Sequence, residues 1–245
     1  MVTDEVWKLP DIVNRFLSYR AAIPLAQEQL GIMVSILKTG SKPVETFLDL
    51  GCGDGILGAA ILGDYPSAHG VLVDFSKPML DQAREQLKNY SKQLVFENLD
   101  YGDSAWVEKI RATEPFDAIV SGYSIHHQPD SRKQSVYQEI FSLLNPGGWF
   151  VNIEHVAPAA TTITNLFEKH YASVRLAIEQ QNGGMRTFAQ VLEEYQNRPD
   201  KAANQLAPVE LQCKWLREIG YEEVDCYFRV YELAVLAGRK PERKS

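Results

Sequence analysis

The sequence has few cysteines, no long apolar segment and no excess of positive charge. Its 245 residues include only three cysteines, Cys52, Cys213 and Cys226, which stand far apart. An odd number of widely spaced cysteines predicts neither a disulfide framework nor a zinc site. It is typical of reduced thiols in the cytosol.

No apolar stretch approaches the roughly 20 residues that a membrane-spanning helix needs. The first residues, MVTDEVWKLPD, carry early acidic residues and lack the apolar run of a signal peptide. We therefore expect a cytoplasmic protein with no membrane span. The 32 acidic and 25 basic side chains give a formal net charge of −7, which argues against broad binding to nucleic acid.

What the sequence does contain is an alternation of strand and helix signals. Short apolar runs that predict buried strands stand at residues 45–51, 70–76, 93–100, 116–122 and 149–155, followed by a strand pair at 222–230 and 231–240. Helical patterns separate most of them, and Asn145-Pro146-Gly147-Gly148 is expected to be a sharp stop between a helix and the fifth strand. This rhythm predicts an α/β fold with a doubly wound, mainly parallel sheet.

Two segments lie outside this rhythm. Residues 1–40 have apolar positions at helical spacing and predict an N-terminal helical cap. Residues 156–207 are largely helical and polar. They either fill one end of the sheet or form a lid over a substrate, and we favour the lid because long insertions beside an α/β crevice are often functional.

The stretch LDLGCGDG places Gly51, Gly53 and Gly55 directly after the first strand. Glycines at this point allow a tight turn and let a ligand approach the backbone. The third glycine comes one residue too early for the dinucleotide fingerprint, and no Gly-Lys-Ser/Thr follows as in a phosphate-binding loop. The glycines alone therefore do not identify the ligand.

Three aspartates, Asp49, Asp74 and Asp100, end the first three strands. Asp49 would disfavour a pyrophosphate but suits an ammonium group, and Asp74 is placed to accept both ribose hydroxyls. Asp100 is placed to accept from an adenine amine. Together they favour a cationic, phosphate-free adenosyl ligand, with helix capping as the alternative role of single aspartates.

At these residues the chain resembles the class I S-adenosylmethionine (SAM) methyltransferases. The resemblance is carried by LDLGCGDG, VLVDFSKPML, ENLDYGD, FDAIVSGYSIHHQPD, LLNPGGWFVNIE and LREIGYEEVDCYFRVYELAVLAGRK, in that order. It implies SAM as the cofactor and a seven-stranded sheet of order 3-2-1-4-5-7-6 with strand 7 antiparallel. One domain would span residues 1–245. Within the family, the chain looks most like small-molecule methyltransferases of the quinone C-methyltransferase and carboxy-SAM synthase type.

The resemblance also implies which residues contact the cofactor. These are Tyr19, Arg20, Asp49, Gly51, Gly53, Gly55, Asp74, Phe75, Met79, Asp100, Tyr101 and Ser121. Tyr19 and Arg20 would close over the methionine moiety, or else be a packing tyrosine and a surface arginine. The apolar residues beside the aspartates would sandwich the adenine, or else belong to the core.

His126, His127 and Glu154 follow the fourth and fifth strands, where an acceptor would meet the methyl group. Each histidine is a candidate general base, substrate contact or loop-orienting residue, and Glu154 is a candidate proton acceptor or a satisfied strand-end acid. Adjacent residues point in divergent directions, so we expect at most one histidine to face the site. No ligand spacing such as HxH or HExxH supports a metal site with Glu154 or His155.

The predicted function is methyl transfer from SAM to a small-molecule acceptor by in-line displacement under the helical lid. Tyr171, Arg175 and Arg186 of the lid are candidates to pair with an acidic substrate, or else ordinary helix residues. The alternatives are a carboxy-SAM synthase-like enzyme and a non-catalytic SAM-binding module. An NAD-dependent dehydrogenase is disfavoured by Asp49 and by the glycine spacing. The sequence leaves open whether the protein forms a homodimer.

Overall fold

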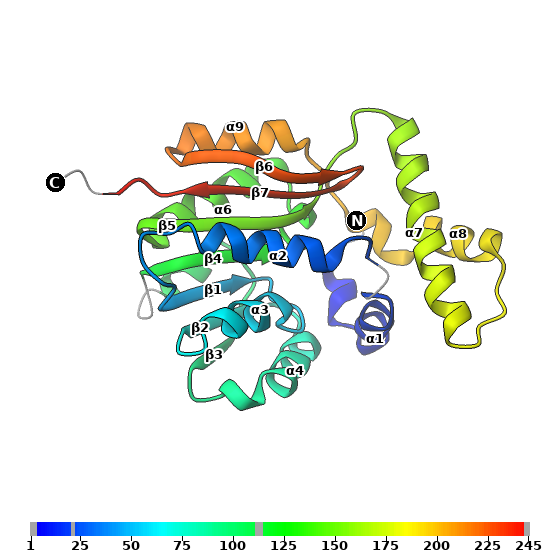
Figure 1. The fold of residues 1–245 in the computed structure, drawn as a ribbon, viewed down its shortest axis with the longest axis horizontal. Coiled ribbons are helices and arrows are strands. Elements are labelled where there is room, and N and C mark those ends of the chain that lie inside the picture. Colours follow the sequence, from blue (N-terminus) through cyan, green and yellow to red (C-terminus); the bar gives the residue numbers. More distant parts are fainter. Residues whose placement is uncertain (1–3, 21–22, 111–114, 243–245) are drawn as a thin grey trace.

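The structure is a computed structural model that describes residues 4–20, 23–110 and 115–242. Seven strands form one sheet in the order β3-β2-β1-β4-β5-β7-β6 (Figure 1). The strands are β1 (Thr46–Leu50), β2 (His69–Asp74), β3 (Leu94–Asn98), β4 (Phe116–Gly122), β5 (Leu144–His155), β6 (Glu222–Val230) and β7 (Leu233–Arg239). Strands β1 to β5 pair in parallel and β7 is antiparallel to both of its neighbours, which confirms the predicted topology.

Helices cover both faces of the sheet. The helices are α1 (Pro10–Tyr19), α2 (Ala26–Leu37), α3 (Ile56–Asp64), α4 (Lys77–Gln86), α5 (Trp106–Ile110), α6 (Asp130–Leu143), α7 (Thr161–Gln181), α8 (Phe188–Gln196) and α9 (Val209–Ile219). Side chains of α5, α6 and α9 pack in one core cluster, and those of α2, α3 and α4 pack in a second cluster on the opposite face. The central strands are buried on both faces, which explains why they read as continuous apolar runs.

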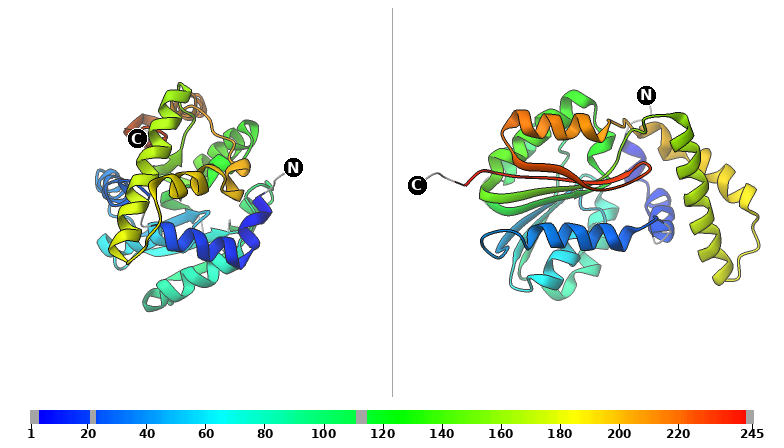
Figure 2. Two further views of the ribbon diagram at one scale, coloured as in Figure 1. Left: turned by 90° about the vertical axis from the view of Figure 1, so that its right-hand side faces the viewer. Right: turned by 45° about the horizontal axis from the view of Figure 1, so that its top comes forward.

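The segment after β5 is helical, as predicted. Helices α7 and α8 and the short 3₁₀ turn η6 (Pro199–Ala203) stand beyond the end of the sheet, on the same side of the molecule as α1 (Figures 1 and 2). Helix α8 begins with a capping box in which Thr187 and Gln190 satisfy each other's backbone donors. This end of the sheet carries the carboxyl ends of the parallel strands.

The predicted start of the fifth strand was wrong. Helix α6 ends at Leu143, but β5 begins at once at Leu144 and runs through the Asn-Pro-Gly-Gly segment. The register against β4 shifts between Phe116 and Ala118, and Gly147 has a φ of 81°. Glycine can adopt this conformation without strain, so the strand bulges here and then rejoins the sheet. The helix does end just before this segment, as predicted.

Candidate functional site

A cavity opens at the carboxyl ends of the parallel strands, under α1 and the helical insertion. Its wall has two parts. The first part comes from the loops after β1 and β2. The second comes from the loop after β4, from the end of β5, from α1, from the insertion and from the first residue of β7.

The loop after β1 brings its backbone to the cavity at Gly51 and Gly53, which have φ values of 68° and 54°. A Cβ on Gly51 would lie 1.9 Å from Ser124 Oγ, whereas one on Gly53 would meet no atom within 4 Å. Gly51 therefore serves close packing, and Gly53 leaves open space for a ligand. Gly55 is not part of the wall; a Cβ there would lie 2.8 Å from Leu87, so this glycine allows packing at the start of α3.

Asp74 ends β2 and lines the cavity. Its carboxylate accepts hydrogen bonds from the backbone N–H groups of Gly53 and Ser76, both at 2.8 Å. Burial raises the pKa of Asp74 to about 6. A carboxylate offers about four lone-pair sites, so Asp74 can still accept from two further hydroxyls. Phe75 and Met79 line the cavity beside it.

Asp49 lies beneath the glycine loop and does not reach the wall. Its side chain is fully buried, and one oxygen accepts from the Gly58 N–H at 3.0 Å. The other oxygen has no hydrogen-bond partner among the described residues. Burial raises the pKa of Asp49 to about 7. This placement supports the loop from below, and a direct contact of Asp49 with the cofactor stays a prediction.

Other predicted cofactor residues also stand outside the cavity wall. Asp100 is exposed and accepts from the Gly102 N–H at 2.7 Å. Tyr101 Oη lies 2.6 Å from Ser124 Oγ, and Ser121 donates to the Leu50 carbonyl at 2.7 Å. These contacts hold the loops together, and their roles toward the cofactor remain predictions.

The N-terminal pair is only partly described. Arg20 forms an ion pair with Asp54 in the glycine loop. The side chain of Tyr19 lies outside the described part of the structure. Instead, Trp7, Arg15 and Phe16 bring this region to the cavity, and sequence analysis missed all three. Their helical spacing alone did not distinguish a cavity wall from a core face.

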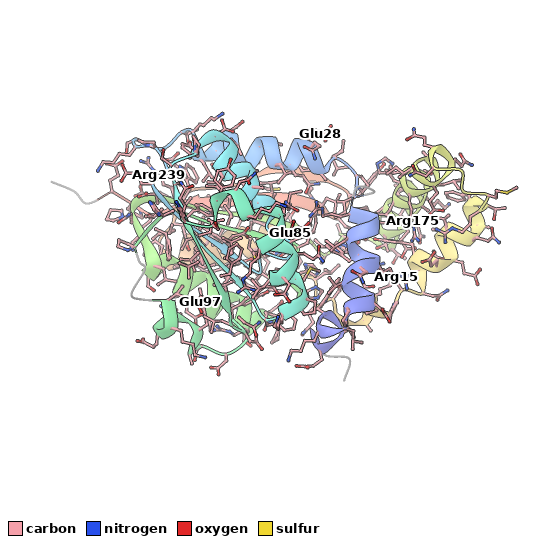
Figure 3. The ribbon with its side chains drawn as sticks, turned by 90° about the horizontal axis from the view of Figure 1, so that it is seen from below. Arg15, Glu28, Glu85, Glu97, Arg175 and Arg239 are labelled. Carbon is pink, nitrogen blue, oxygen red and sulfur yellow. The ribbon has the colours of Figure 1, made fainter. Side chains whose placement is uncertain are left out.

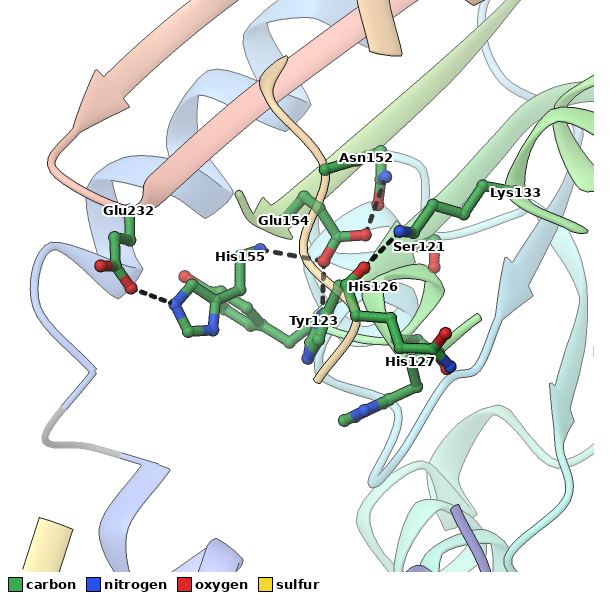
Figure 4. Close-up of polar contacts among 12 residues, drawn as sticks. Ser121, Tyr123, His126, His127, Lys133, Asn152, Glu154, His155 and Glu232 are labelled. Atoms are coloured by element: carbon green, nitrogen blue, oxygen red, sulfur yellow. Dashed lines mark hydrogen bonds and ion pairs between the residues drawn. The ribbon is translucent and has the colours of Figure 1, made fainter. Parts of the chain in front are cut away.

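His126 and Glu154 form a buried pair (Figure 4). Nδ1 of His126 lies 2.6 Å from Glu154 Oε1, and the same oxygen accepts from the His155 N–H at 2.9 Å. Asn152 donates to the other oxygen at 3.2 Å, and the side chain of Asn204 hydrogen-bonds the His126 ring. Burial lowers the pKa of His126 well below its usual value and raises the pKa of Glu154 to about 7.

Both His126 and His127 line the cavity, so the expectation that at most one of them faces it was wrong. The two residues lie in the 3₁₀ turn η5 (Ile125–His127), where three residues make one turn and neighbours diverge less than they do in a strand. Their ring centroids are 4.1 Å apart. Nδ1 of His127 lies 3.4 Å from the Ala203 carbonyl, and burial lowers the pKa of His127 to about 3.

A second carboxylate–histidine pair stands beside the first. Nε2 of His155 lies 2.7 Å from Oε2 of the buried Glu232, and the His155 ring lines the cavity (Figure 4). Sequence analysis placed His155 at the crevice with a metal site as its only named role, and it missed Glu232. The antiparallel register that pairs His155 with Leu233 brings the two together, and register cannot be read from one sequence.

Within residues 4–20, 23–110 and 115–242, no group of three histidine, cysteine, aspartate or glutamate side chains is placed to hold a metal ion. No helix in this part of the chain is both long and apolar enough to cross a bilayer.

Comparison with known proteins confirms the predicted resemblance. Residues 47–148 match a family model described as a methyltransferase domain. A demethylmenaquinone methyltransferase of Lactococcus lactis is 28% identical over 177 residues, which are 72% of this chain and 66% of that protein. A carboxy-S-adenosyl-L-methionine synthase of Actinobacillus succinogenes is 28% identical over 171 residues, covering 68% of this chain and 66% of that protein. Residues 47–148 are therefore similar to a methyltransferase domain.

The fold is shared more widely than the sequence. The structure of an O-methyltransferase family protein from Burkholderia thailandensis superposes with a TM-score of 0.62 at 15% identity, over 86% of this chain and 56% of that chain. The matched residues cover just under two thirds of the length of the Lactococcus lactis protein and of the Actinobacillus succinogenes protein.

Proposed function

We propose that the protein transfers a methyl group from SAM to a small-molecule acceptor. The observation that carries the proposal is that one cavity joins the glycine loop and Asp74 to the buried His126–Glu154 pair. The methyltransferase domain and the names of the relatives support the same reaction.

The residues of the strand-end loops fit SAM. Asp74 would accept the two ribose hydroxyls, and Phe75 and Met79 would flank the adenine. The open space at Gly53 would let the methionine moiety approach the backbone. When bound, SAM supplies a methyl group that is already activated as a sulfonium. The protein's main task is then to place the acceptor close and in line, an effect worth up to roughly 7–11 kcal/mol.

The second task is to take a proton from the acceptor. Burial keeps His126 neutral. In the tautomer with its hydrogen on Nδ1, His126 donates a hydrogen bond to the Glu154 carboxylate. The lone pair of the other ring nitrogen, Nε2, can then accept a proton from the acceptor when the Asn204 side chain does not donate to it. Such a base contributes typically 10²–10⁴-fold for an acceptor that is protonated at neutral pH.

The insertion acts as the lid over this reaction. It supplies Phe167, Tyr171, Arg175 and Tyr195 to the cavity wall. On the opposite side, Arg15 of α1 pairs with Glu194 of α8 at 2.9 Å, so the N-terminal cap and the insertion meet over the cavity. This closure excludes water from the acceptor and the methyl group.

The test is to identify by mass spectrometry the small molecule that freshly purified protein releases on denaturation, and to titrate the emptied protein with S-adenosylhomocysteine. We expect SAM or S-adenosylhomocysteine to be released, and the emptied protein to bind S-adenosylhomocysteine. A carboxylated SAM would instead favour the carboxy-SAM synthase activity of the second relative. Release of NAD, or failure to bind S-adenosylhomocysteine, would refute the proposal.

A further inference from the structure

The cavity wall holds two histidines that each pair with a buried carboxylate (Figure 4). Glu154 holds His126 and Glu232 holds His155, and the two imidazole rings lie edge to face with their centroids 5.6 Å apart. Glu154 and His155 are neighbours at the end of β5, and the Glu154 carboxylate also accepts from the His155 backbone N–H. Because both rings line the cavity, one small molecule can contact both of them.

The two histidines differ in how their second ring nitrogen is used. The His126 ring makes one hydrogen bond with Glu154 and another with the side chain of Asn204. The His155 ring makes one, from Nε2 to Glu232 at 2.7 Å, and its Nδ1 has no hydrogen-bond partner among the described residues. Nδ1 is also not sealed off by the surrounding protein atoms. A ligand in the cavity can therefore reach this nitrogen.

Glu232 determines which nitrogen of His155 carries the hydrogen. The Glu232 side chain is only 4% exposed, and its second oxygen has no hydrogen-bond partner among the described residues. An ionised carboxylate has acceptors only, so it selects the tautomer in which Nε2 of His155 carries the hydrogen and donates it. Nδ1 then presents a lone pair to the cavity and acts as a hydrogen-bond acceptor.

The wall beside His155 is aromatic. The Phe167 ring lies 5.5 Å from the His155 ring, centroid to centroid. Tyr171 and Tyr195 stack with their ring centroids 4.1 Å apart and an interplanar angle of 26°. All of these side chains line the cavity, so a flat apolar body can lie against them.

The N-terminal cap and the insertion cover this part of the cavity. Arg15 of α1 and Arg175 of α7 both line the wall and both pair with Glu194, so they lie close together where the two segments meet (Figure 3). Away from water, a hydrogen-bonding group that a ligand leaves without a partner is costly. A site of this kind discriminates against a ligand that lacks the matching group.

We propose that His155, held by Glu232, determines which acceptors bind: its Nδ1 accepts a hydrogen bond from a hydroxyl or N–H group on a flat apolar acceptor. This group is a second polar group of the acceptor, separate from the one that is methylated beside His126. The inference rests on the proposed function and adds a specificity-determining residue, His155, and a positioning residue, Glu232, to the same site.

The first experiment uses the full chain saturated with S-adenosylhomocysteine, after a titration has shown that it binds. Ligand-observed NMR measures the dissociation constants of several one-ring and two-ring phenols and aryl amines, each beside the compound in which fluorine replaces the hydroxyl or amino group. The two members of a pair have nearly the same shape, and only one of them donates a hydrogen bond. We expect at least one donor compound to bind fivefold or more tightly than its fluoro analogue.

A double variant locates this preference. Replacing His155 alone would leave Glu232 buried without its partner, which is costly, so the variant is His155→Phe/Glu232→Leu, in which two apolar side chains replace the pair. The control is His170→Phe, the same change at a histidine of α7 outside the cavity wall. We expect the preference to fall below twofold in the double variant and to stay at fivefold or more in the control. Affinity for S-adenosylhomocysteine should be unchanged in both.

Nitrogen-15 NMR of the five histidine rings tests the role of Glu232 without any acceptor. The His155 signals are identified by their loss in the double variant, and in the wild type we expect them to show the hydrogen on Nε2. Glu232→Gln keeps an acceptor oxygen and should keep this tautomer. Glu232→Leu removes the acceptor, and the tautomer with the hydrogen on Nδ1 should then appear.

The inference is wrong if no donor compound binds more tightly than its fluoro analogue, or if His155→Phe/Glu232→Leu keeps the preference. It is also wrong if wild-type His155 carries its hydrogen on Nδ1, or if Glu232→Leu leaves the tautomer unchanged. Failure of the wild-type protein to bind S-adenosylhomocysteine is a separate result, and it would refute the proposed function on which the inference rests.

Discussion

The two halves of the cavity are built in different ways. The half assigned to the cofactor comes from two short loops that follow β1 and β2, and its key contacts are backbone N–H groups and one carboxylate. The half assigned to the acceptor is assembled from side chains of α1, η5, the end of β5, the insertion and the start of β7. The first half is therefore specified by local sequence and the second by tertiary packing.

The largest expected effect falls on the acceptor half. Replacing His126 by Asn removes the candidate base, and we expect the rate of methyl transfer to fall by about 10²–10⁴-fold. Affinity for S-adenosylhomocysteine should not change, because His126 belongs to the other half. Steady-state kinetics and calorimetry on one preparation measure both quantities. The control is His170→Asn on α7, outside the cavity wall, which should keep at least half of the activity. Equal loss in both variants would contradict the assignment.

The cofactor half should respond most strongly to Asp74→Ala. The variant can no longer accept the two hydrogen bonds expected from the ribose hydroxyls. A hydrogen bond to a charged group is worth about 1.5–3 kcal/mol. We expect calorimetry to report a dissociation constant for S-adenosylhomocysteine that is about 100-fold or more above that of the wild type. Asp100→Ala is the matched control, because this exposed aspartate stands outside the wall. A larger loss at Asp100 than at Asp74 would reverse the assignment of the two carboxylates.

These two carboxylates also show how much could be predicted from the sequence. Gly51, Gly53 and Asp74 were all predicted and line the cavity, because a strand followed by glycines fixes the local backbone. Asp100 and Ser121 also lie near the carboxyl ends of parallel strands, but they do not line the cavity. A position near the end of a strand does not reveal which way its side chain turns. Arg15 and Glu232 come from distant elements, and only helix docking and strand register bring them to the site.

The cofactor half should also depend on pH. Burial raises the pKa of Asp74 from 3.8 to about 6, so the unliganded protein holds a proton there below that pH. Ribose hydroxyls donate to the ionised carboxylate, and affinity for S-adenosylhomocysteine should therefore rise with pH. Between pH 5 and 7 we expect an increase of about tenfold, as one proton is lost. Calorimetric titrations across this range test it, with Asp74→Asn as the control that should lose the dependence. Affinity that falls as pH rises would contradict the prediction.

The smallest effect tests whether the halves are independent. Thr187→Ala removes the side-chain cap of α8, which should destabilise the insertion locally by about 1 kcal/mol. Hydrogen exchange should be faster in α8 and unchanged in β1 and β2. S-adenosylhomocysteine affinity should stay within twofold of the wild type. A large loss of affinity would show that the insertion supports the cofactor half directly.

The most direct test of the account is a crystal structure of the protein with S-adenosylhomocysteine bound. We predict that the ribose hydroxyls lie within hydrogen-bond distance of the Asp74 carboxylate, and that the adenine lies between Phe75 and Met79. The sulfur should face the side of the cavity that holds His126. A nucleoside bound elsewhere, or one that leaves Asp74 without a contact, would contradict the division of the cavity into a cofactor half and an acceptor half.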